Sequence, residues 1–318
     1  MTRVTADAFV SYAQNREDVV LWRALHDVEG GTYVEVGAHH ATELSVSKAF
    51  YDRGWSGLCI EAMPQLAEEF AAARPRDTVV QAAVLDTDAD TVVLHAVEGT
   101  GLSTVVDEVG AEHGEHGWVV HDVEVPARRL DDLLDEHVEG EVHWLLVDTE
   151  GAEPSVLASV DLRRWRPWVL VVEATAPLSN EPTHESWEPG VLAAGYELCL
   201  FDGLSRFYVA EEHAERLRPL LSYPACVLDP YVTHDVHDMR TRLHEAVTEV
   251  IRWRGQVLQR WTEAASAALD APGAGGHPGH EAARLRAELD ALHSTLSWRV
   301  TAPLRTVRRA QLQRSPRA

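Results

Sequence analysis

The feature that most constrains the fold is one segment near the N-terminus that alternates strand, glycine turn, helix and strand. Thr32–Val36 is a short apolar and β-branched run that stops at Gly37, which is the pattern of a buried strand entering a tight turn. The stretch Glu43–Arg53 is compatible with a helix, and a second buried strand, Gly57–Ile60, then ends on the acid Glu61. This order predicts the nucleotide-binding half of a doubly wound α/β sheet.

The turn and the terminal acid of this segment indicate which ligand it binds. Gly37 lets the backbone approach a ligand, and an acid in the position of Glu61 can accept both hydroxyls of a ribose. A dinucleotide fingerprint needs three glycines at this turn, whereas only one is present. The pattern therefore favours a nucleoside without phosphates, such as S-adenosylmethionine, over NAD. A pair of core strands with no ligand is the alternative that the segment leaves open.

Length and composition bound the class of protein. The 318 residues suffice for one large domain with an appendage or for two small domains, and 45% hydrophobic residues suffice for a core. No apolar run is long enough to cross a membrane, and residues 1–8 lack the charged-then-apolar pattern of a signal peptide. Three cysteines without metal-type spacing agree with a reducing compartment. We expect a cytoplasmic protein.

Charge is distributed unevenly along the chain. The formal net charge is −23, yet residues 281–318 hold eight Arg against three acids, a balance of +5 that leaves −28 on the preceding 280 residues. So acidic a body is expected to repel nucleic acid. Residues 298–318 combine six Arg and no acid with apolar anchors. This end is suited either to an anionic membrane, which would place the protein at its inner face, or to the acidic body itself.

Further apolar runs extend the sheet. The expected strands are Thr78–Val84, Thr91–Val97, Trp118–Val125, Val142–Val147, Trp168–Val172 and the antiparallel pair Tyr196–Phe201 and Arg206–Val209. The expected helices are Leu66–Ala73, Arg129–Leu134 and Pro154–Val160, with a polar turn at His113–Gly117 and no element over residues 211–233. We predict a sheet of about seven strands whose last pair is antiparallel.

The C-terminal part has a different organisation. The α/β domain is expected to span residues 1–233 and to be followed by a helical extension at 234–270 and a Gly/Pro linker at 271–280. Residues 281–318 then combine a short coiled-coil-like helix with the basic tail. Four leucines repeat a heptad for barely two heptads: Leu285, Leu289, Leu292 and Leu296. These C-terminal helices offer a route to a homo-oligomer.

Acidic residues gather where strands are expected to end. Asp148, Glu150 and Glu153 follow one predicted strand, and Glu173 ends the next. The carboxyl ends of neighbouring parallel strands meet at the edge where open α/β sheets bind ligands. Some of these acids could cap the following helix, but three on one turn exceed what a cap needs. At the end of the third strand, Ala83 is small enough for a flat base to lie against the backbone.

Together these residues resemble the FkbM family of S-adenosylmethionine-dependent methyltransferases. The matching motifs are Gln14–Asp18, Tyr33–Ala38, Ser45–Gly57, Glu61 with Pro64, and Val147–Glu153. Three later runs fit a branch that accompanies glycan biosynthesis: Glu173–Pro177, His184–Pro189 and Phe201–Tyr208. The similarity covers about residues 9–230. It departs at His39 and His40, where the family usually has Asn-Asp or a close relative.

The resemblance implies a class I methyltransferase with a Rossmann-like, seven-stranded sheet and S-adenosylmethionine as cofactor. The expected cofactor-binding residues are Glu35, Gly37, Ala38, His39, Glu61, Ala83 and Asp148. The implied reaction is O-methylation of a sugar hydroxyl in a glycan, glycolipid or polysaccharide precursor. A sugar-nucleotide oxidoreductase and a non-catalytic scaffold that acts through its helical arms are the alternatives.

An oxygen acceptor needs help, because a sugar hydroxyl is too weak an acid to react freely at neutral pH. Either a general base takes its proton or a divalent metal lowers its pKa. His184 is the candidate base, and Asp148, Glu150 and Glu173 are further catalytic candidates. Asp148 and Glu173 could hold Mg²⁺. Equally, Asp148 could contact the methionine part of the donor and Glu173 could bind the sugar.

Overall fold

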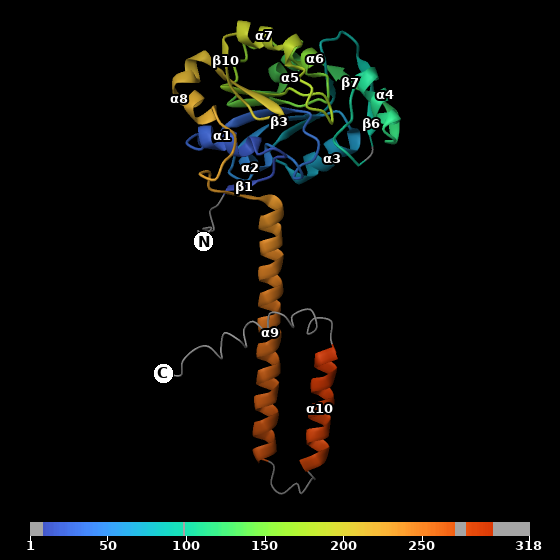
Figure 1. Cartoon of the computed structure of the whole chain (residues 1–318), viewed down its shortest axis with the longest axis vertical. Coiled ribbons are helices and arrows are strands. Elements are labelled where there is room, and N and C mark those ends of the chain that lie inside the picture. Colours follow the sequence, from blue (N-terminus) through green and yellow to red (C-terminus); the bar gives the residue numbers. More distant parts are fainter. Residues whose placement is uncertain (1–8, 98, 271–277, 295–318) are drawn as a thin grey trace. The chain divides into compact units, whose positions relative to one another are not determined.

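The computed structural model describes residues 9–97, 99–270 and 278–294 (Figure 1). The chain divides into two compact units, Met1–Arg242 and Leu243–Ala318. The first unit is an α/β domain that contains every strand found in the described residues. No helix in these ranges is both long enough and apolar enough to span a bilayer.

A seven-stranded sheet forms the centre of the domain. In spatial order its strands are β10 (Tyr196–Phe201), β11 (Ser205–Ala210), β9 (Val169–Glu173), β8 (Trp144–Val147), β2 (Thr32–Val36), β3 (Ser56–Glu61) and β4 (Thr78–Gln81). The strands from β9 to β4 pair in parallel, whereas β11 is antiparallel to both of its neighbours. The prediction of a doubly wound sheet with seven strands and an antiparallel last pair is confirmed.

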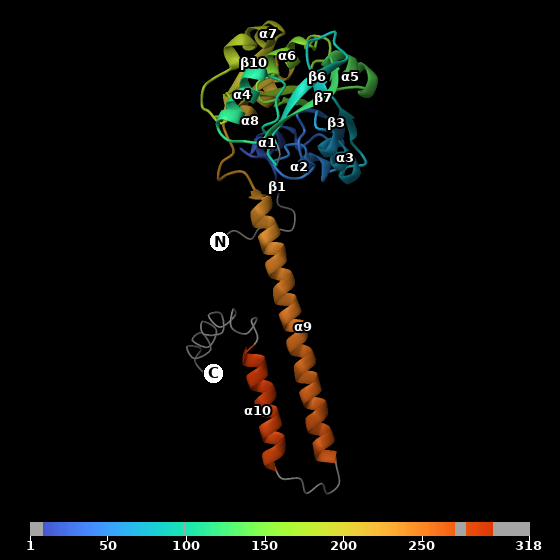
Figure 2. The same ribbon diagram turned by 90° about the vertical axis from the view of Figure 1, so that its right-hand side faces the viewer.

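Successive side chains of the central strands point to opposite faces of the sheet, and each face has its own apolar core. Val34 and Leu145 belong to the core shared with α5, α6 and α7, while Tyr33 and Trp144 belong to the core shared with α1, α2, α3 and α8. Figures 1 and 2 show these two groups of helices on the two sides of the sheet. Their bounds are Glu17–Leu25 (α1), Lys48–Tyr51 (α2), Pro64–Ala73 (α3), Leu130–His137 (α5), Glu153–Ala158 (α6), Glu188–Ala193 (α7) and Glu211–Leu221 (α8).

The helix predicted over Glu43–Arg53 is wrong in its first half, because α2 begins only at Lys48. Leu44 has a left-handed backbone (φ 57°) and a side chain that is 57% exposed instead of forming part of an apolar face. The buried guanidinium group of Arg74 binds hydroxyl groups of this stretch and so holds it in a loop. Its Nη atoms donate to the hydroxyls of Ser45 and Ser47 at 2.7 and 2.6 Å. A partner distant in sequence therefore fixes a loop where local periodicity favours a helix.

The single strand predicted over Thr78–Val84 is also wrong, because the chain changes sheets at Ala82. Gln81 still pairs with Glu61 of the main sheet, whereas Ala83 pairs with Ala127. The second, three-stranded sheet has the order β5 (Ala83–Val84), β7 (Val120–Arg128) and β6 (Thr91–Val97). Figure 1 shows β6 and β7 together with α4 (Asp107–Glu115) at one side of the domain.

Two further expectations are corrected. The polarity of its neighbours predicts a polar turn at His113, but this residue lies in the last turn of α4. Residues 211–233 contain α8 and the short strand β12 (Tyr231–Thr233), which pairs in parallel with β1 (Phe9–Ser11). The apolar Leu217 and Leu221 anchor α8 in the core beside α1, although Pro219 lies within that helix.

In the C-terminal part, helix α9 spans His234–Asp270 and helix α10 spans Pro278–Ser294. Helix α9 occupies the residues of the predicted helical extension, although the first compact unit runs to Arg242, and the last residues of the predicted linker, from Pro278, are helical. Residues 271–277 and the basic tail from residue 295 lie outside the described residues. The coiled-coil pairing of the leucines and the homo-oligomer stay predictions.

Candidate active site

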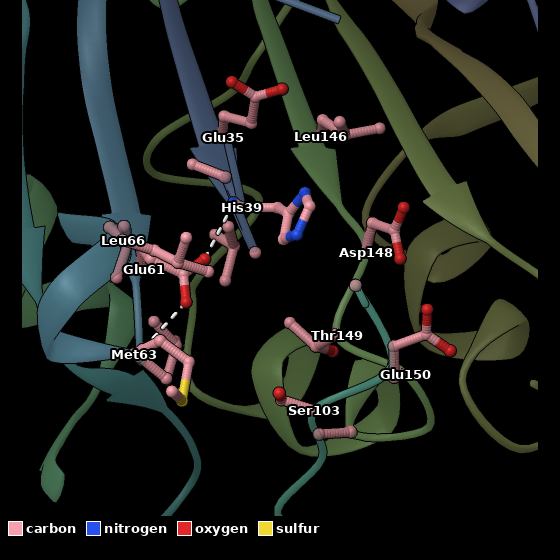
Figure 3. A pocket seen from close by; sticks show the side chains of 18 of the residues that line it. Glu35, His39, Glu61, Met63, Leu66, Ser103, Leu146, Asp148, Thr149 and Glu150 are labelled. Atoms are coloured by element: carbon pink, nitrogen blue, oxygen red, sulfur yellow. Dashed lines mark hydrogen bonds between the residues drawn. The ribbon is translucent and has the colours of Figure 1, made fainter. Parts of the chain in front are cut away.

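A cavity opens where the parallel strands β2, β3 and β8 end (Figure 3). All the cofactor candidates named from the sequence border it. Its wall comprises residues 35–39, 60–63, 82–84 and 148–150, together with Gln14, Glu17, Leu44, Val46, Leu66, Leu94, Thr100, Gly101, Ser103, Val105, Leu146, Ala152 and Leu204. The sheet thus brings together residues that are more than a hundred positions apart in the sequence.

The turn after β2 is fixed by backbone contacts. Gly37 has a φ of 84°, and a Cβ atom there would lie 1.7 Å from the carbonyl oxygen of Asp148. The N–H groups of Gly37 and Ala38 both donate to the carbonyl of Ile60 at 3.0 Å. Only glycine fits this position, because the turn is both left-handed and in direct contact with the chain leaving β8.

Glu61, at the end of β3, presents a carboxylate that the backbone already orients. Its two oxygens accept the N–H groups of His39 and Met63, each at 2.7 Å. Its side chain is 7% exposed, and this burial raises the pKa of Glu61 to about 7, while the two N–H groups act in the opposite direction. Each carboxylate oxygen has a second lone pair. Glu61 can therefore accept the two hydroxyls of a ribose without losing its backbone bonds.

An apolar region of the wall lies near Glu61. It is formed by Met63 and Leu66 around the start of α3, by Ala83 and Val84 of β5, and by Leu94 of β6. Ala83 borders the cavity, and its expected role of letting a flat base lie against the backbone stays a prediction. Such a surface suits the flat, largely apolar faces of a nucleobase.

His39, Glu35 and His40 have different surroundings. In Figure 3 the ring of His39 lies between Glu61 on one side and Asp148 on the other, and burial lowers the pKa of His39. Glu35 is buried and accepts the hydroxyl of Ser47, and burial raises its pKa to about 7. His40 accepts the N–H groups of Thr42 and Glu43 at 3.1 and 2.9 Å. The departure from the family pattern thus has a local structural role, since His40 closes the loop after the turn.

Three carboxyl groups meet on the other side of the cavity, and we call them the acid cluster: Asp148, Glu150 and Glu173. One oxygen of each lies within 4.8 Å of the other two. Burial raises the pKa of all three, and the neighbouring carboxylates raise the pKa of Glu150, to about 8, and of Glu173 further. Asp148 and Glu150 border the cavity, whereas Glu173 does not and is only 7% exposed.

Glu153, the fourth acid of this region, is the first residue of α6 and binds the turn that precedes the helix. Its carboxylate accepts the N–H and the hydroxyl of Thr149 at 2.9 and 3.0 Å, and the N–H of Gly151 at 3.2 Å. These contacts close the turn that leads into α6. The expectation that some of these acids cap the next helix is wrong, because the N-cap residue of α6 is Ala152 and no side chain caps the helix.

His184, the candidate base, is not among the residues that border the cavity. It lies in a short 3₁₀ helix, η1 (His184–Ser186), with its Nε2 atom 3.9 Å from an oxygen of Glu188. The carboxylate of Glu188 also accepts Arg206 and the hydroxyl of Tyr208 at 2.5 and 2.8 Å. The structure thus joins His184 to an ion-pair network, and its role as a base stays a prediction.

The sequence analysis missed Gln14, Glu17 and Leu204 as lining residues. Glu17 is buried in the first turn of α1, where it accepts the N–H of Asn15 at 3.0 Å, and burial raises its pKa to about 8. Its neighbour Asp18 instead binds Ser11 and the backbone after β1. The signals were the motif Gln14–Asp18, whose acids also suit the start of a helix, and the run Phe201–Tyr208, which contains Leu204.

The sequence matches the profile of the methyltransferase FkbM domain over residues 35–198. The chain belongs to the FkbM methyltransferase family. It is accordingly an S-adenosylmethionine-dependent methyltransferase with a class I, Rossmann-like fold. This membership decides against the oxidoreductase and the non-catalytic scaffold. The match spans β2 to the first half of β10, and therefore the whole acid cluster.

Solved structures of methyltransferases resemble this FkbM chain at low identity. A TehB-like S-adenosylmethionine-dependent methyltransferase from Corynebacterium glutamicum has 11% identity and a TM-score of 0.35, covering 61% of this chain and 86% of that one. Methyltransferase FkbM from Methylobacillus flagellatus has 13% identity and a TM-score of 0.38, covering 64% and 48%. Fibrillarin from Aeropyrum pernix, bound to S-adenosylmethionine, has 13% identity and a TM-score of 0.34, covering 60% and 73%. No curated protein matches the sequence.

Proposed function

We propose that the protein transfers a methyl group from S-adenosylmethionine to a hydroxyl group of a sugar in a glycan, glycolipid or polysaccharide precursor. The observation that carries this proposal is the division of the cavity into two regions. Glu61 and the apolar side chains of Met63 and Leu66 suit a nucleoside, and Asp148 and Glu150 of the acid cluster lie across His39 from them (Figure 3). Carboxylates accept hydrogen bonds without donating any, and sugar hydroxyls supply such donors.

The cavity fits the donor in chemical terms. When bound, S-adenosylmethionine supplies an electrophilic methyl group on a positively charged sulfur. Glu61 would accept the ribose hydroxyls, and the turn at Gly37 would let the rest of the donor approach the backbone. A wall rich in carboxylates favours a cationic sulfur, whereas a basic wall would repel it. The described residues that border the cavity include no Lys or Arg.

The chain's contribution to the transfer is alignment and proton removal. Methyl transfer is an in-line displacement, so the two reactants must be held with the acceptor oxygen opposite the sulfur. Glu150 borders the cavity and would take the hydroxyl proton through one of its oxygens. Asp148, which also borders the cavity, would hold the sugar in position. His184 is the alternative base, acting from the network around Glu188.

The location of the substrate is part of the proposal. We infer that the reaction takes place in the cytoplasm, with the Arg-rich residues 298–318 holding the enzyme near a lipid-linked acceptor at an anionic membrane. Each Arg near such a surface contributes about 1 kcal/mol, so binding should weaken with salt. Flotation with anionic vesicles tests this: the full chain should float and a chain ending at residue 294 should not. Equal flotation of both chains would contradict it.

Methyl-transfer assays with sorted acceptors test the reaction itself. The purified protein would be incubated with S-adenosylmethionine carrying a labelled methyl group and, separately, with sugar nucleotides, lipid-linked sugars, free oligosaccharides, a peptide mixture and RNA. Label in a sugar ether is the expected result. Label confined to the peptides or to RNA, at comparable donor turnover, would contradict the sugar proposal and leave the methyltransferase activity standing.

A further inference from the structure

We propose that Asp148, Glu150 and Glu173 bind one divalent cation of the class that prefers oxygen ligands, Mg²⁺ or Mn²⁺, and that this cation holds the acceptor hydroxyl. The inference rests on the proposed function, since the hydroxyl acceptor is part of it. It assigns a ligand to a group of three carboxyl groups that the fold places together and leaves without counter-charge.

The sheet itself creates the spacing of the ligands. β8 and β9 are adjacent and parallel, and Val147 pairs with Val172, so Asp148 and Glu173 follow at the same level of the sheet. Glu150 reaches the same point because its backbone is left-handed (φ 52°) in the turn before α6. One oxygen of each lies within 4.8 Å of the others. Oxygens about 2.1 Å from a bound Mg²⁺ lie about 3 to 4 Å apart, so small side-chain shifts would suffice.

A second observation, independent of the spacing, is that Glu173 differs from the other buried acids in its hydrogen-bond partners. Glu17, Asp18, Glu35, Glu61 and Glu153 are buried, and each accepts at least one N–H or hydroxyl donor. Glu173 is the sixth buried acid of the described residues. Its carboxyl group hydrogen-bonds to that of Asp148, but its Oε2 atom has no hydrogen-bond partner. A buried carboxylate without a donor is costly, so such an atom indicates a missing ligand.

No side chain of the described residues supplies the missing positive charge. Every ion pair that the structure contains in these ranges joins other acids, and none involves Asp148, Glu150 or Glu173. Two other acids show how the chain supplies a counter-charge elsewhere: Asp77 pairs with Arg74 at 3.6 Å, and Glu188 pairs with Arg206 at 2.5 Å. A proton shared among the three carboxyl groups is the competing occupant.

The cation would give the hydroxyl its reactivity. It would lower the pKa of the acceptor hydroxyl, as divalent metals do for bound water. The hydroxyl proton then passes to the oxygen of Glu150 that does not bind the cation. The acceptor oxygen forms its bond to the methyl carbon while the carbon–sulfur bond breaks, and that electron pair stays on sulfur. The step balances in atoms and in charge, and the cation is not consumed.

Binding of Mn²⁺ to the full chain tests the inference without any acceptor. The free Mn²⁺ signal in electron paramagnetic resonance would be followed in high salt, which suppresses loose binding to an acidic surface. Wild type should bind one Mn²⁺ that Mg²⁺ displaces. Glu173→Gln and Glu150→Gln should each weaken binding at least tenfold. Asp132→Asn, which removes an exposed acid of α5, is the matched control and should leave binding unchanged.

The outcomes separate this inference from the proposed function. Absence of Mn²⁺ binding in wild type, or equal binding by wild type and Glu150→Gln, would refute the cation site. The acid cluster would then be assigned a shared proton instead. Because Glu150 is only half-buried, its variant is expected to fold even if Glu173→Gln does not. S-adenosylmethionine binding is measured in parallel by calorimetry. If the wild type binds S-adenosylmethionine but not Mn²⁺, the cation site alone is refuted, whereas a wild type that binds Mn²⁺ but not S-adenosylmethionine refutes the proposed function alone.

Discussion

Gly37 and Asp148 touch: a Cβ atom at residue 37 would lie 1.7 Å from the Asp148 carbonyl oxygen. The N–H of Asp148 also donates to the carbonyl of Val36 at 3.0 Å, so the two strand ends are joined on both sides of this contact. The turn that approaches the donor and the chain that carries the acid cluster therefore share one backbone junction. A substitution at Gly37 should therefore affect both the turn that approaches the donor and the chain that carries the acid cluster.

We predict that Gly37→Ala lowers both stability and donor affinity. The left-handed backbone alone costs a non-glycine residue about 1–2 kcal/mol, and the clash with Asp148 adds to it. Gly140→Ala is a matched control, because Gly140 has a nearly identical φ of 85° with nothing within 4 Å of its Cβ position. Chemical denaturation should show a clearly larger loss for Gly37→Ala, with donor affinity at least tenfold weaker. Equal losses of stability for Gly37→Ala and Gly140→Ala would contradict the predicted effect of the contact with Asp148.

Glu61→Gln is expected to weaken S-adenosylmethionine binding about 10- to 150-fold, because hydrogen bonds to a charged group contribute about 1.5–3 kcal/mol. Since burial raises the pKa of Glu61 to about 7, donor affinity of the wild type should fall as the pH drops through 7. The variant should have lost this pH dependence. Glu68→Gln, an exposed acid of α3, is the control. Calorimetry between pH 5.5 and about 8.5 measures both effects; unchanged affinity would remove Glu61 from the donor site.

The stability of the ligand-free protein should decrease between about pH 4.5 and pH 8. Burial raises the folded-state pKa of Glu17 to about 8, of Asp18 to about 6 and of Glu35 to about 7, above their unfolded values. The folded state then binds more protons than the unfolded state, so unfolding becomes easier as the pH rises through this window. Glu17→Gln should flatten the upper part of the curve. Melting temperatures that rise across the window in chelator would contradict this prediction.

The strand ends were predictable from the sequence because parallel strands that are buried on both faces are continuous apolar runs. Glu61 and Glu173 stand where such runs stop, so their common edge followed from the pattern. Two other features depend on contacts that no local pattern contains. Arg74 holds the loop before α2 from 27 residues away through Ser47, and Ala83 leaves the main sheet to pair with Ala127. Glu17 was ambiguous because a helix start and a cavity wall both suit an acid.

Glu150→Gln and His184→Gln together decide which residue removes the proton. If Glu150 is the base, its variant should turn over about 10²–10⁴-fold more slowly with donor affinity preserved, since general bases contribute about that much. His184→Gln should then stay within a few-fold of wild type, because His184 does not border the cavity. The reverse result would assign the base to His184 and limit Glu150 to the acid cluster.

The most direct test of the central claim is to find the atom that receives the methyl group. The protein would be incubated with S-adenosylmethionine carrying a deuterated methyl group and with lipid-linked and nucleotide-linked sugars, and the product would be mapped by mass spectrometry and NMR. The account predicts a deuterated methyl ether on a sugar oxygen, strongly reduced in Glu61→Gln and Glu150→Gln but retained in Asp132→Asn. A labelled methyl group on nitrogen or carbon, or a sugar ether formed equally by all variants, would contradict it.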